Sequence, residues 1–186
     1  MARWPEVPAC WGWLALDERG RWRLGQAQDG RRGEVVRHRG LADYLARNYG
    51  AADDGAWFVQ NGPQRVFCDL DAAPWVLHAD DDGAALTHTG LTVARLSAAL
   101  LDESGRLFAA TEHGLALVGS DLAAAWLDHL RRADGQPADV ADLAADAPLT
   151  LTVGDTTLPL ERVRHRDLPA RFGFQPAPRP SSSAST

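Results

Sequence analysis

The chain carries an internal repeat, and this repeat constrains its fold more than any other feature of the sequence. Residues 14–22, Leu-Ala-Leu-Asp-Glu-Arg-Gly-Arg-Trp, return 85 positions later as residues 99–107, Ala-Leu-Leu-Asp-Glu-Ser-Gly-Arg-Leu. The helical pattern of residues 41–49 returns 81 positions later as residues 122–130. The change of spacing falls between these segments, where connecting loops accept changes of length at little cost in free energy. The repeat therefore indicates one hairpin-plus-helix unit that is used twice.

Each copy of the unit predicts a β-hairpin, a helix and a second β-hairpin. Two apolar strands flank an Asp-Glu-Arg-Gly turn in residues 13–24, which is typical of a hairpin. Residues 41–49 carry apolar side chains along one side of a helix, and the second helix is expected to run to about Arg132. The second hairpins are expected at residues 57–70 and 149–163. We therefore predict an α+β fold made of internally duplicated β-hairpin–helix–β-hairpin units, mainly antiparallel sheet with one helix packed on each.

The pattern also predicts the boundaries of the repeats. Residues 1–12 contain two prolines and are expected to form an irregular lead-in. Residues 13–96 form the first predicted α+β repeat, and residues 97–174 form the second. Proline and serine dominate residues 175–186, and this composition predicts a disordered tail.

The charges of the chain exclude several classes of function. The net charge is −6, which argues against a partner that is a nucleic acid, because such proteins need a basic face. All 19 basic side chains are arginines. Without lysine the chain has neither a Schiff-base residue for pyridoxal phosphate nor a P-loop, and we expect no cofactor. Arginine remains able to bind a carboxylate or a phosphate through two hydrogen bonds.

The location of the protein follows from equally simple features. The two cysteines are too few for a disulfide framework. The first residues lack an apolar signal segment, and no apolar run approaches the length that spans a membrane. We expect a cytoplasmic protein that does not associate with membranes.

A polar turn between two apolar strands is the most promising candidate for a binding site. It holds two glutamines, an asparagine and an arginine, whose side chains can orient and anchor an anionic ligand, and a tryptophan lies on either side of it in the sequence. The same residues also suit a well-formed hairpin turn, in which the arginine pairs across the strands, and the tryptophans suit a hydrophobic core. The predicted ligand-binding residues are Gln60, Asn61, Gln64, Arg65, Trp57 and Trp75.

Two motifs resemble those of a known family. Residues 58–67, Phe-Val-Gln-Asn-Gly-Pro-Gln-Arg-Val-Phe, and residues 168–174, Leu-Pro-Ala-Arg-Phe-Gly-Phe, resemble the signature of an uncharacterised family of bacterial proteins found mainly in proteobacteria. The resemblance covers about residues 11–174 and implies no catalytic residue, because that family has no established activity. The repeat also resembles a second uncharacterised bacterial family whose fold combines pleckstrin-homology-like and cystatin-like halves.

Catalytic and metal-binding patterns are weak in this sequence. The six histidines show none of the spacings typical of zinc sites, so we expect no metal. No serine lies in a nucleophile elbow, and Cys68 falls on the apolar side of its expected strand. His88 or His113, each with a carboxylate, would be the acid–base pair of an enzyme.

We therefore predict a binding module without catalytic residues, which takes a small anionic ligand or a protein partner. Two alternatives remain open. One is a hydrolase or isomerase that uses a histidine–carboxylate pair, and the other is a structural protein that assembles through exposed strand edges.

Overall fold

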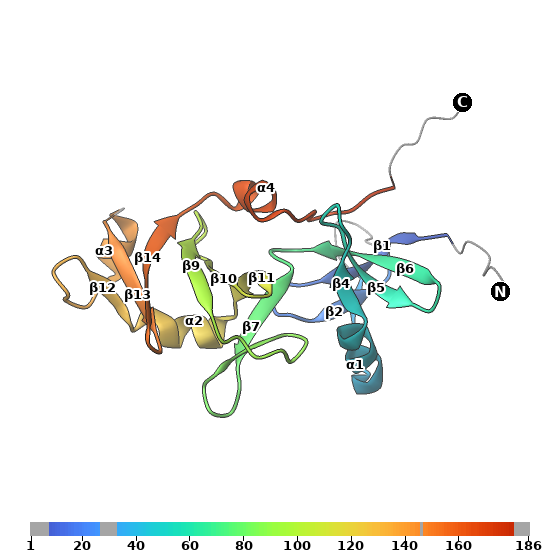
Figure 1. Ribbon diagram of the computed structural model, residues 1–186, viewed down its shortest axis with the longest axis horizontal. Coiled ribbons are helices and arrows are strands. Elements are labelled where there is room, and N and C mark those ends of the chain that lie inside the picture. The colour runs from blue at the N-terminus through green and yellow to red at the C-terminus, as the bar shows by residue number, and fades with distance from the viewer. Residues whose placement is uncertain (1–7, 27–32, 146, 181–186) are drawn as a thin grey trace. The chain divides into compact units, whose positions relative to one another are not determined.

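The computed structural model describes residues 8–26, 33–145 and 147–180 (Figure 1). The predicted α+β class is confirmed, because the described chain consists mostly of two sheets with few helices. None of the helices in these ranges is long and apolar enough to cross a bilayer.

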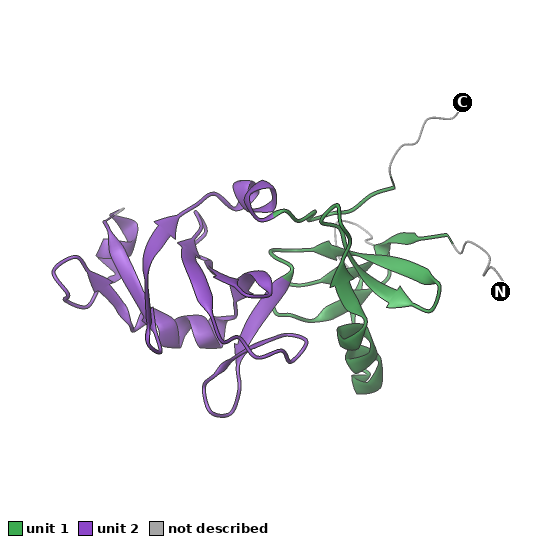
Figure 2. Cartoon of the chain, in the orientation of Figure 1, with its two compact units in different colours: residues 1–74, 173–186 green, residues 75–172 purple. Residues whose placement is uncertain are grey.

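The chain divides into two compact units (Figure 2). Unit 1 comprises residues 1–74 and 173–186, and unit 2 comprises residues 75–172. This division differs from the predicted repeats in two places. Residues 75–96, expected in the first repeat, contribute strands to the sheet of unit 2. Residues 173–180, most of them expected in a disordered tail, belong to unit 1, and the rest of that tail lies outside the described residues.

In its described residues, unit 1 is a six-stranded sheet with one helix. Its elements are β1 (Cys10–Leu16), β2 (Trp22–Leu24), β3 (Glu34–Val35), α1 (Arg39–Arg47), β4 (Tyr49–Ala51), β5 (Trp57–Asn61) and β6 (Gln64–Leu70). The strand order is β3-β2-β1-β6-β5-β4. The central pair, β1 and β6, is parallel, and the other pairs are antiparallel. The first and last strands of the unit therefore meet in the middle of the sheet.

The two faces of this sheet differ in burial. Leu14 and Leu16 on β1 lie beside Cys68 and Leu70 on β6, and all four side chains are buried. Alternation along a strand puts Ala15 on β1 and Asp69, beside it on β6, on the opposite face. We call the face of Leu14 the core face and the opposite one the open face.

Unit 2 is an eight-stranded sheet with three short α-helices. Its elements are β7 (Trp75–Ala79), β8 (Ala85–Thr87), β9 (Leu96–Leu101), β10 (Leu107–Thr111), β11 (Gly114–Val118), α2 (Ser120–Leu127), β12 (Leu130–Arg132), α3 (Val140–Ala144), β13 (Leu149–Val153), β14 (Thr156–Arg162), a 3-10 turn η1 (His165–Asp167) and α4 (Leu168–Phe172). The strand order is β12-β13-β14-β9-β10-β11-β7-β8.

Six strands of unit 2 repeat the arrangement of unit 1. Strands β9 to β14 have the order and the pair orientations of β1 to β6, including the parallel central pair β9–β14. The register agrees as well. Leu14 lies opposite Leu24 in unit 1, and Ala99 lies opposite Ala109 in unit 2. Strands β7 and β8 extend the second sheet at the edge of β11, to which β7 is parallel.

The structure corrects the predicted unit in two respects. Each half contains three strands on either side of the helix rather than two, and each sheet contains at least one parallel pair that local patterns did not predict. The helices also end earlier than expected. Tyr49 and Leu130 lie in strands β4 and β12, because each pairs with a strand of the following hairpin and is drawn into the sheet.

Candidate functional site

The polar turn between β5 and β6 is built from the residues predicted to bind a ligand. Gln60 pairs with Arg65, and Asn61 pairs with Gln64, across a turn in which Gly62 adopts a positive φ of 56°. The Gln60 Nε2 donates to the backbone oxygens of Gly62 at 2.7 Å and Gln64 at 3.3 Å. These bonds tie the Gln60 side chain to its own hairpin.

The other two carboxamides of this turn are also bonded to the chain. The Gln64 Nε2 donates to the backbone oxygen of Pro8 at 2.9 Å, and the Asn61 Oδ1 accepts from the Tyr44 hydroxyl at 3.1 Å. Their hydrogen bonds hold the turn against α1 and the segment before β1. This engagement favours the structural interpretation of the carboxamides.

The arginine and tryptophans of the predicted site do not assemble around the turn. The Arg65 guanidinium carbon lies 4.5 Å from the centre of the Phe58 ring, on the open face of unit 1. Alternation along β5 puts Trp57 on the opposite face, where its ring centre lies 4.8 Å from that of Tyr49. Trp75 begins unit 2, and its Nε1 donates to the backbone oxygen of His113 at 2.8 Å.

Histidine–carboxylate pairs are present in unit 2, but their groups are bonded to the backbone. His113 Nε2 lies 4.0 Å from the Glu112 Oε1 and 2.9 Å from the Thr92 carbonyl oxygen. The Glu112 carboxylate accepts hydrogen bonds from the backbone nitrogens of Ala94 and Arg95, and these lower its pKa against the opposing effect of burial. This pair therefore anchors the loop before β9.

The histidine most shifted in pKa is held neutral. Burial, with a smaller effect of His78, lowers the pKa of His88 to about 3. Its Nδ1 accepts from the Val76 nitrogen at 3.4 Å, and its ring lies 5.6 Å from that of Trp75. Within the described ranges, no three His, Cys, Asp or Glu side chains form a group that could hold a metal ion.

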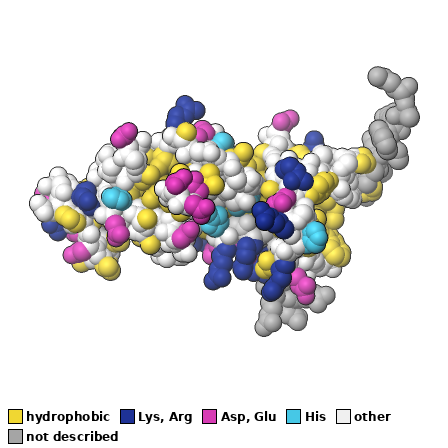
Figure 3. All heavy atoms as spheres, turned by 90° about the horizontal axis from the view of Figure 1, so that it is seen from below, with side chains coloured by type: hydrophobic (Ala, Val, Ile, Leu, Met, Phe, Trp, Pro, Cys, Tyr) yellow, Lys and Arg dark blue, Asp and Glu magenta, His cyan; other side chains and the backbone are white. Residues whose placement is uncertain are grey.

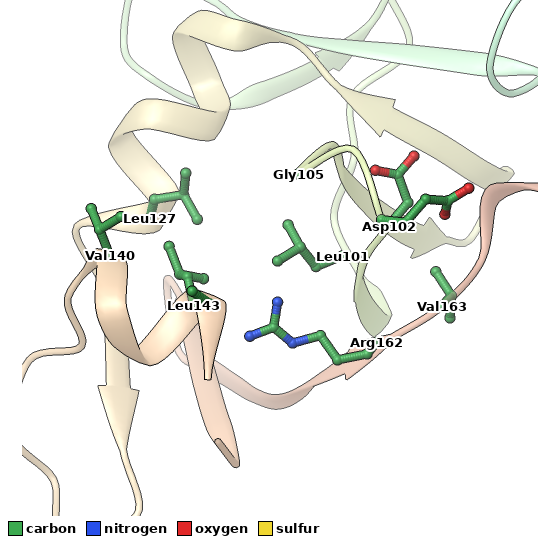
Figure 4. Close-up of a pocket in the computed structure, with 10 residues that line it drawn as sticks. Leu101, Asp102, Gly105, Leu127, Val140, Leu143, Arg162 and Val163 are labelled. Atoms are coloured by element: carbon green, nitrogen blue, oxygen red, sulfur yellow. The ribbon is translucent and has the colours of Figure 1, made fainter. Parts of the chain in front are cut away.

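A pocket of about 510 Å³ lies in unit 2 (Figure 4). This volume is within the range of small-molecule sites, about 300–1,000 Å³. Apolar side chains from β9, α2, α3 and the end of β14 dominate its wall. The residues that line it are Leu101, Asp102, Glu103, Gly105, Leu127, Val140, Leu143, Ala144, Arg162 and Val163.

An arginine stands among these apolar side chains. Arg162 is the last residue of β14, and Figure 4 shows its guanidinium extending between Leu101 and Leu143. In the parallel central pair, Arg162 lies beside Leu101 just as Leu70 lies beside Leu16 in unit 1. Leu70 is only 3% exposed, so unit 1 fills this core-face position with a buried leucine. Unit 2 places a cation there.

The two acidic residues of the pocket are bonded on its rim. Asp102 accepts from the nitrogens of Ser104 and Arg106 and from the Arg106 Nε, and Figure 4 shows its carboxylate pointing away from Arg162. The Glu103 carboxylate accepts from the His165 nitrogen at 2.8 Å, and this bond lowers its pKa. Both carboxylates are thus held by donors other than Arg162.

Helix α3 forms the outer wall of the pocket. Asp139 and Asp142 form a capping box that starts this five-residue helix. Its Val140 is 81% exposed although it lines the pocket, and no residue of the helix is buried. The wall therefore offers apolar surface that a ligand would cover.

The predicted site did not include this pocket. The alternation of Leu158, Leu160 and Arg162 along β14 is the signal that places the arginine on the core face.

Charge elsewhere on the surface is mixed. Figure 3, seen from the side of α1, shows several arginine side chains gathered on one part of that face, with acidic side chains among them.

Comparison with known proteins places the chain in a family. The family model DUF2944, described as protein of unknown function (DUF2946), matches residues 1–179. The chain belongs to this family. The predicted membership of a family of unknown function is thus confirmed at this level. No curated protein matches the chain.

One solved structure shows a similar fold. A DUF1285 family protein from Silicibacter pomeroyi DSS-3 is 13% identical with a TM-score of 0.54, and the match covers 83% of this chain and 82% of that one. A second DUF1285 family protein, from Shewanella baltica OS155, is 16% identical with a TM-score of 0.39, over 57% and 84% of the two chains. At such low identity the first match shows a shared fold alone.

Proposed function

We propose that this DUF2944 family member is a binding module whose second unit takes a small ligand with an apolar body and one anionic group. The position of Arg162 carries the proposal. A charged side chain on the core face of a sheet costs free energy, since burial removes its hydration. Unit 1 shows that the fold accepts leucine at this position. An arginine beside an apolar cavity suits a carboxylate or phosphate, and a guanidinium has five N–H donors to share among acceptors.

The proposal moves the predicted site from the first unit to the second. The carboxamides of the polar turn already form hydrogen bonds within the chain. A binding site at that turn, with Arg65 as the anchor, stays a prediction. The pocket in unit 2 instead combines a volume of about 510 Å³, mostly apolar walls and a cation. It therefore supports the predicted class of function, a binding module, with different residues.

A set of matched amphiphiles tests the pocket. Octanoate, octanol and octylamine share one apolar chain and differ in charge. The midpoint temperature of thermal unfolding, Tm, of the full chain should rise most with octanoate, less with octanol and least with octylamine. At a concentration about a hundred times the dissociation constant, a ligand stabilises by about 2.7 kcal/mol, which raises Tm by roughly 5–10 °C. Equal shifts for octanoate and octylamine would contradict the proposal.

Two variants locate the effect. Arg162→Leu, which copies the residue of unit 1, should remove the preference for octanoate over octanol. Arg65→Ala should keep that preference, because Arg65 lies in the other unit. If Arg65→Ala loses the preference and Arg162→Leu keeps it, the polar turn is the site and the pocket is not.

We also infer that the two units are copies of one ancestral segment. The shared strand order, the shared register and the recurring Asp-Glu-x-Gly-Arg turn support this origin. On this view the copies have diverged in the core, where Leu70 corresponds to Arg162, and the link between β12 and β13 has acquired α3.

A further inference from the structure

Unit 2 departs from unit 1 at two places, and both lie at the pocket. One is the core-face position in the parallel central pair, where unit 1 has Leu70 and unit 2 has Arg162. The other is a link between strands. In unit 1 the link between β4 and β5 is a tight turn, in which the Ala52 nitrogen donates to the Ala56 oxygen at 2.8 Å. In unit 2 the corresponding link, between β12 and β13, contains α3, which lines the pocket together with Arg162.

Helix α3 is held in place by its polar side chains. In the capping box, the carboxylates of Asp139 and Asp142 each accept from the other residue's backbone nitrogen at 2.9 Å. The Asp142 carboxylate also lies 3.7 Å from the Nη1 of Arg132, the last residue of β12. No residue of the helix is buried, so burial of apolar surface contributes little to its position.

The apolar side chains of α3 belong to the wall of the pocket. Val140, Leu143 and Ala144 have the spacing of one side of a helix, and all three line the pocket. Figure 4 shows Leu143 between Val140 and the Arg162 guanidinium. Val140 is 81% exposed. Apolar surface of α3 therefore extends from the guanidinium past Leu143 to Val140, and much of it is still in contact with solvent.

The rest of the apolar wall is aliphatic. It includes Leu101 on β9, Leu127 on α2 and Val163 after β14, and no aromatic side chain is among the described residues that line the pocket. Such a wall offers no ring on which an aromatic ligand could stack, so it suits an alkyl chain. Each methylene group that leaves water for an apolar site raises the affinity by about fourfold.

We propose that the ligand of this pocket is an aliphatic anion, and that Val140 and Leu143 determine the length of the chain that binds best. This specificity rests on the proposed function, because it places the anionic group at Arg162. From there the alkyl chain runs along α3, contacts Leu143 first and reaches Val140 only when it is long enough. The affinity rises with each methylene until the chain passes Val140, and further methylenes then enter solvent and add little.

A series of straight-chain carboxylates from butanoate to decanoate tests this specificity in the full chain. Isothermal titration calorimetry should give dissociation constants that fall by up to about fourfold per added methylene and then level off. Val140→Ser should leave the shortest carboxylates unaffected and make the affinity level off at a shorter chain. Leu143→Ser should weaken binding at shorter chains as well. Ala141→Ser, at an exposed residue of α3 that does not line the pocket, should leave the whole series unchanged.

The outcomes separate this specificity from the proposed function. Octanoate can bind through Arg162 while Val140→Ser and Leu143→Ser keep the chain-length dependence of the wild type. The chain-length proposal is then overturned, and the proposed function stands. It is also overturned if Ala141→Ser changes the series as Val140→Ser does, because the effect then comes from the helix as a whole. If no carboxylate of the series binds, both proposals fail. Circular dichroism checks that each variant keeps its fold.

Discussion

Asp17 and Asp102 hold the same place in the two units and have three hydrogen bonds in common. The Asp17 carboxylate accepts from the nitrogens of Arg19 and Arg21 and from the Arg21 Nε, at 2.9–3.0 Å. Asp102 accepts from the corresponding groups of Ser104 and Arg106, at 2.7–2.9 Å. Each aspartate thus closes a turn that joins two strands. It also forms an ion pair with the arginine just after the turn, Arg21 in unit 1 and Arg106 in unit 2. Both carboxylates are buried, so these bonds replace lost hydration.

We expect Asp17→Ala to destabilise unit 1 by about 2 kcal/mol, because several partly buried donors lose a charged acceptor. Arg23, which also bonds the Asp17 Oδ2, would lose its partner as well. Urea unfolding measures the change. Glu18→Ala, at the exposed neighbour, is the control and should have a small effect. A loss as small as that of the control would mean that the turn forms without its carboxylate.

The stability conferred by Asp17 should depend on pH. Burial alone would raise the pKa of Asp17, but hydrogen bonds from Arg21, Arg23 and Arg19 lower it below its ordinary value of 3.8. A lowered pKa in the folded state means that the contribution is complete above 3.8 and is lost as the pH falls through the folded-state pKa. Comparison of wild type and Asp17→Asn in urea between neutral and acidic pH should therefore show their stabilities converging only in acid.

His88 should weaken the fold at mildly acidic pH. The pKa of His88 is about 3 in the folded protein against 6.5 when the side chain is solvated. Between these pH values the unfolded state therefore binds a proton that the folded state does not bind. Stability from this residue is complete above 6.5 and is lost as the pH falls toward 3, by about 1.4 kcal/mol per pH unit. His88→Leu should flatten the dependence of unfolding free energy on pH between these values. The exposed His129, changed to Gln, should leave it unaltered.

Arg162→Leu should leave the protein as stable as the wild type or make it more stable, by up to about 1 kcal/mol. Replacement of a poorly hydrated charge by a well-packed apolar side chain is often neutral or favourable. Leu70 shows that leucine suits this position in the sheet. Urea unfolding without ligand measures the effect. A loss of stability would assign Arg162 a structural role and remove the reason for placing an anion in the pocket.

The C-terminal segment should stabilise unit 1 mainly through Phe174. This side chain is buried, so Phe174→Ala should cost about 3 kcal/mol. Arg179→Ala should cost about 1 kcal/mol or less, because the Arg179 side chain is 56% exposed and solvent screens its ion pair. Urea unfolding of both variants gives the comparison. If Phe174→Ala proves as mild as Arg179→Ala, residues 173–180 contribute little to the unit.

Local patterns in the sequence were sufficient for the hairpin turns and the fold class. The Asp-Glu-x-Gly-Arg turns, the strands around them and the helix of residues 39–47 depend on neighbours in the chain, which periodicity and turn residues report. The polar turn at residues 60–65 was also found where predicted, as a hairpin. Its role as a binding site stays a prediction, because hydrogen bonds from Gln60 to its own turn were not visible in the pattern.

The sequence by itself determined the α+β class and predicted that one unit of strands and a helix occurs twice, since repetition is visible without any contact. Only the tertiary structure decided that β1 meets β6 and β9 meets β14 in parallel, that β7 joins the second sheet, and that residues 173–180 return to the first unit. Those contacts join residues far apart in the chain, and no local propensity encodes which strands will meet. The same pairing placed Arg162, the last residue of β14, beside Leu101 and so made it the cation of a pocket.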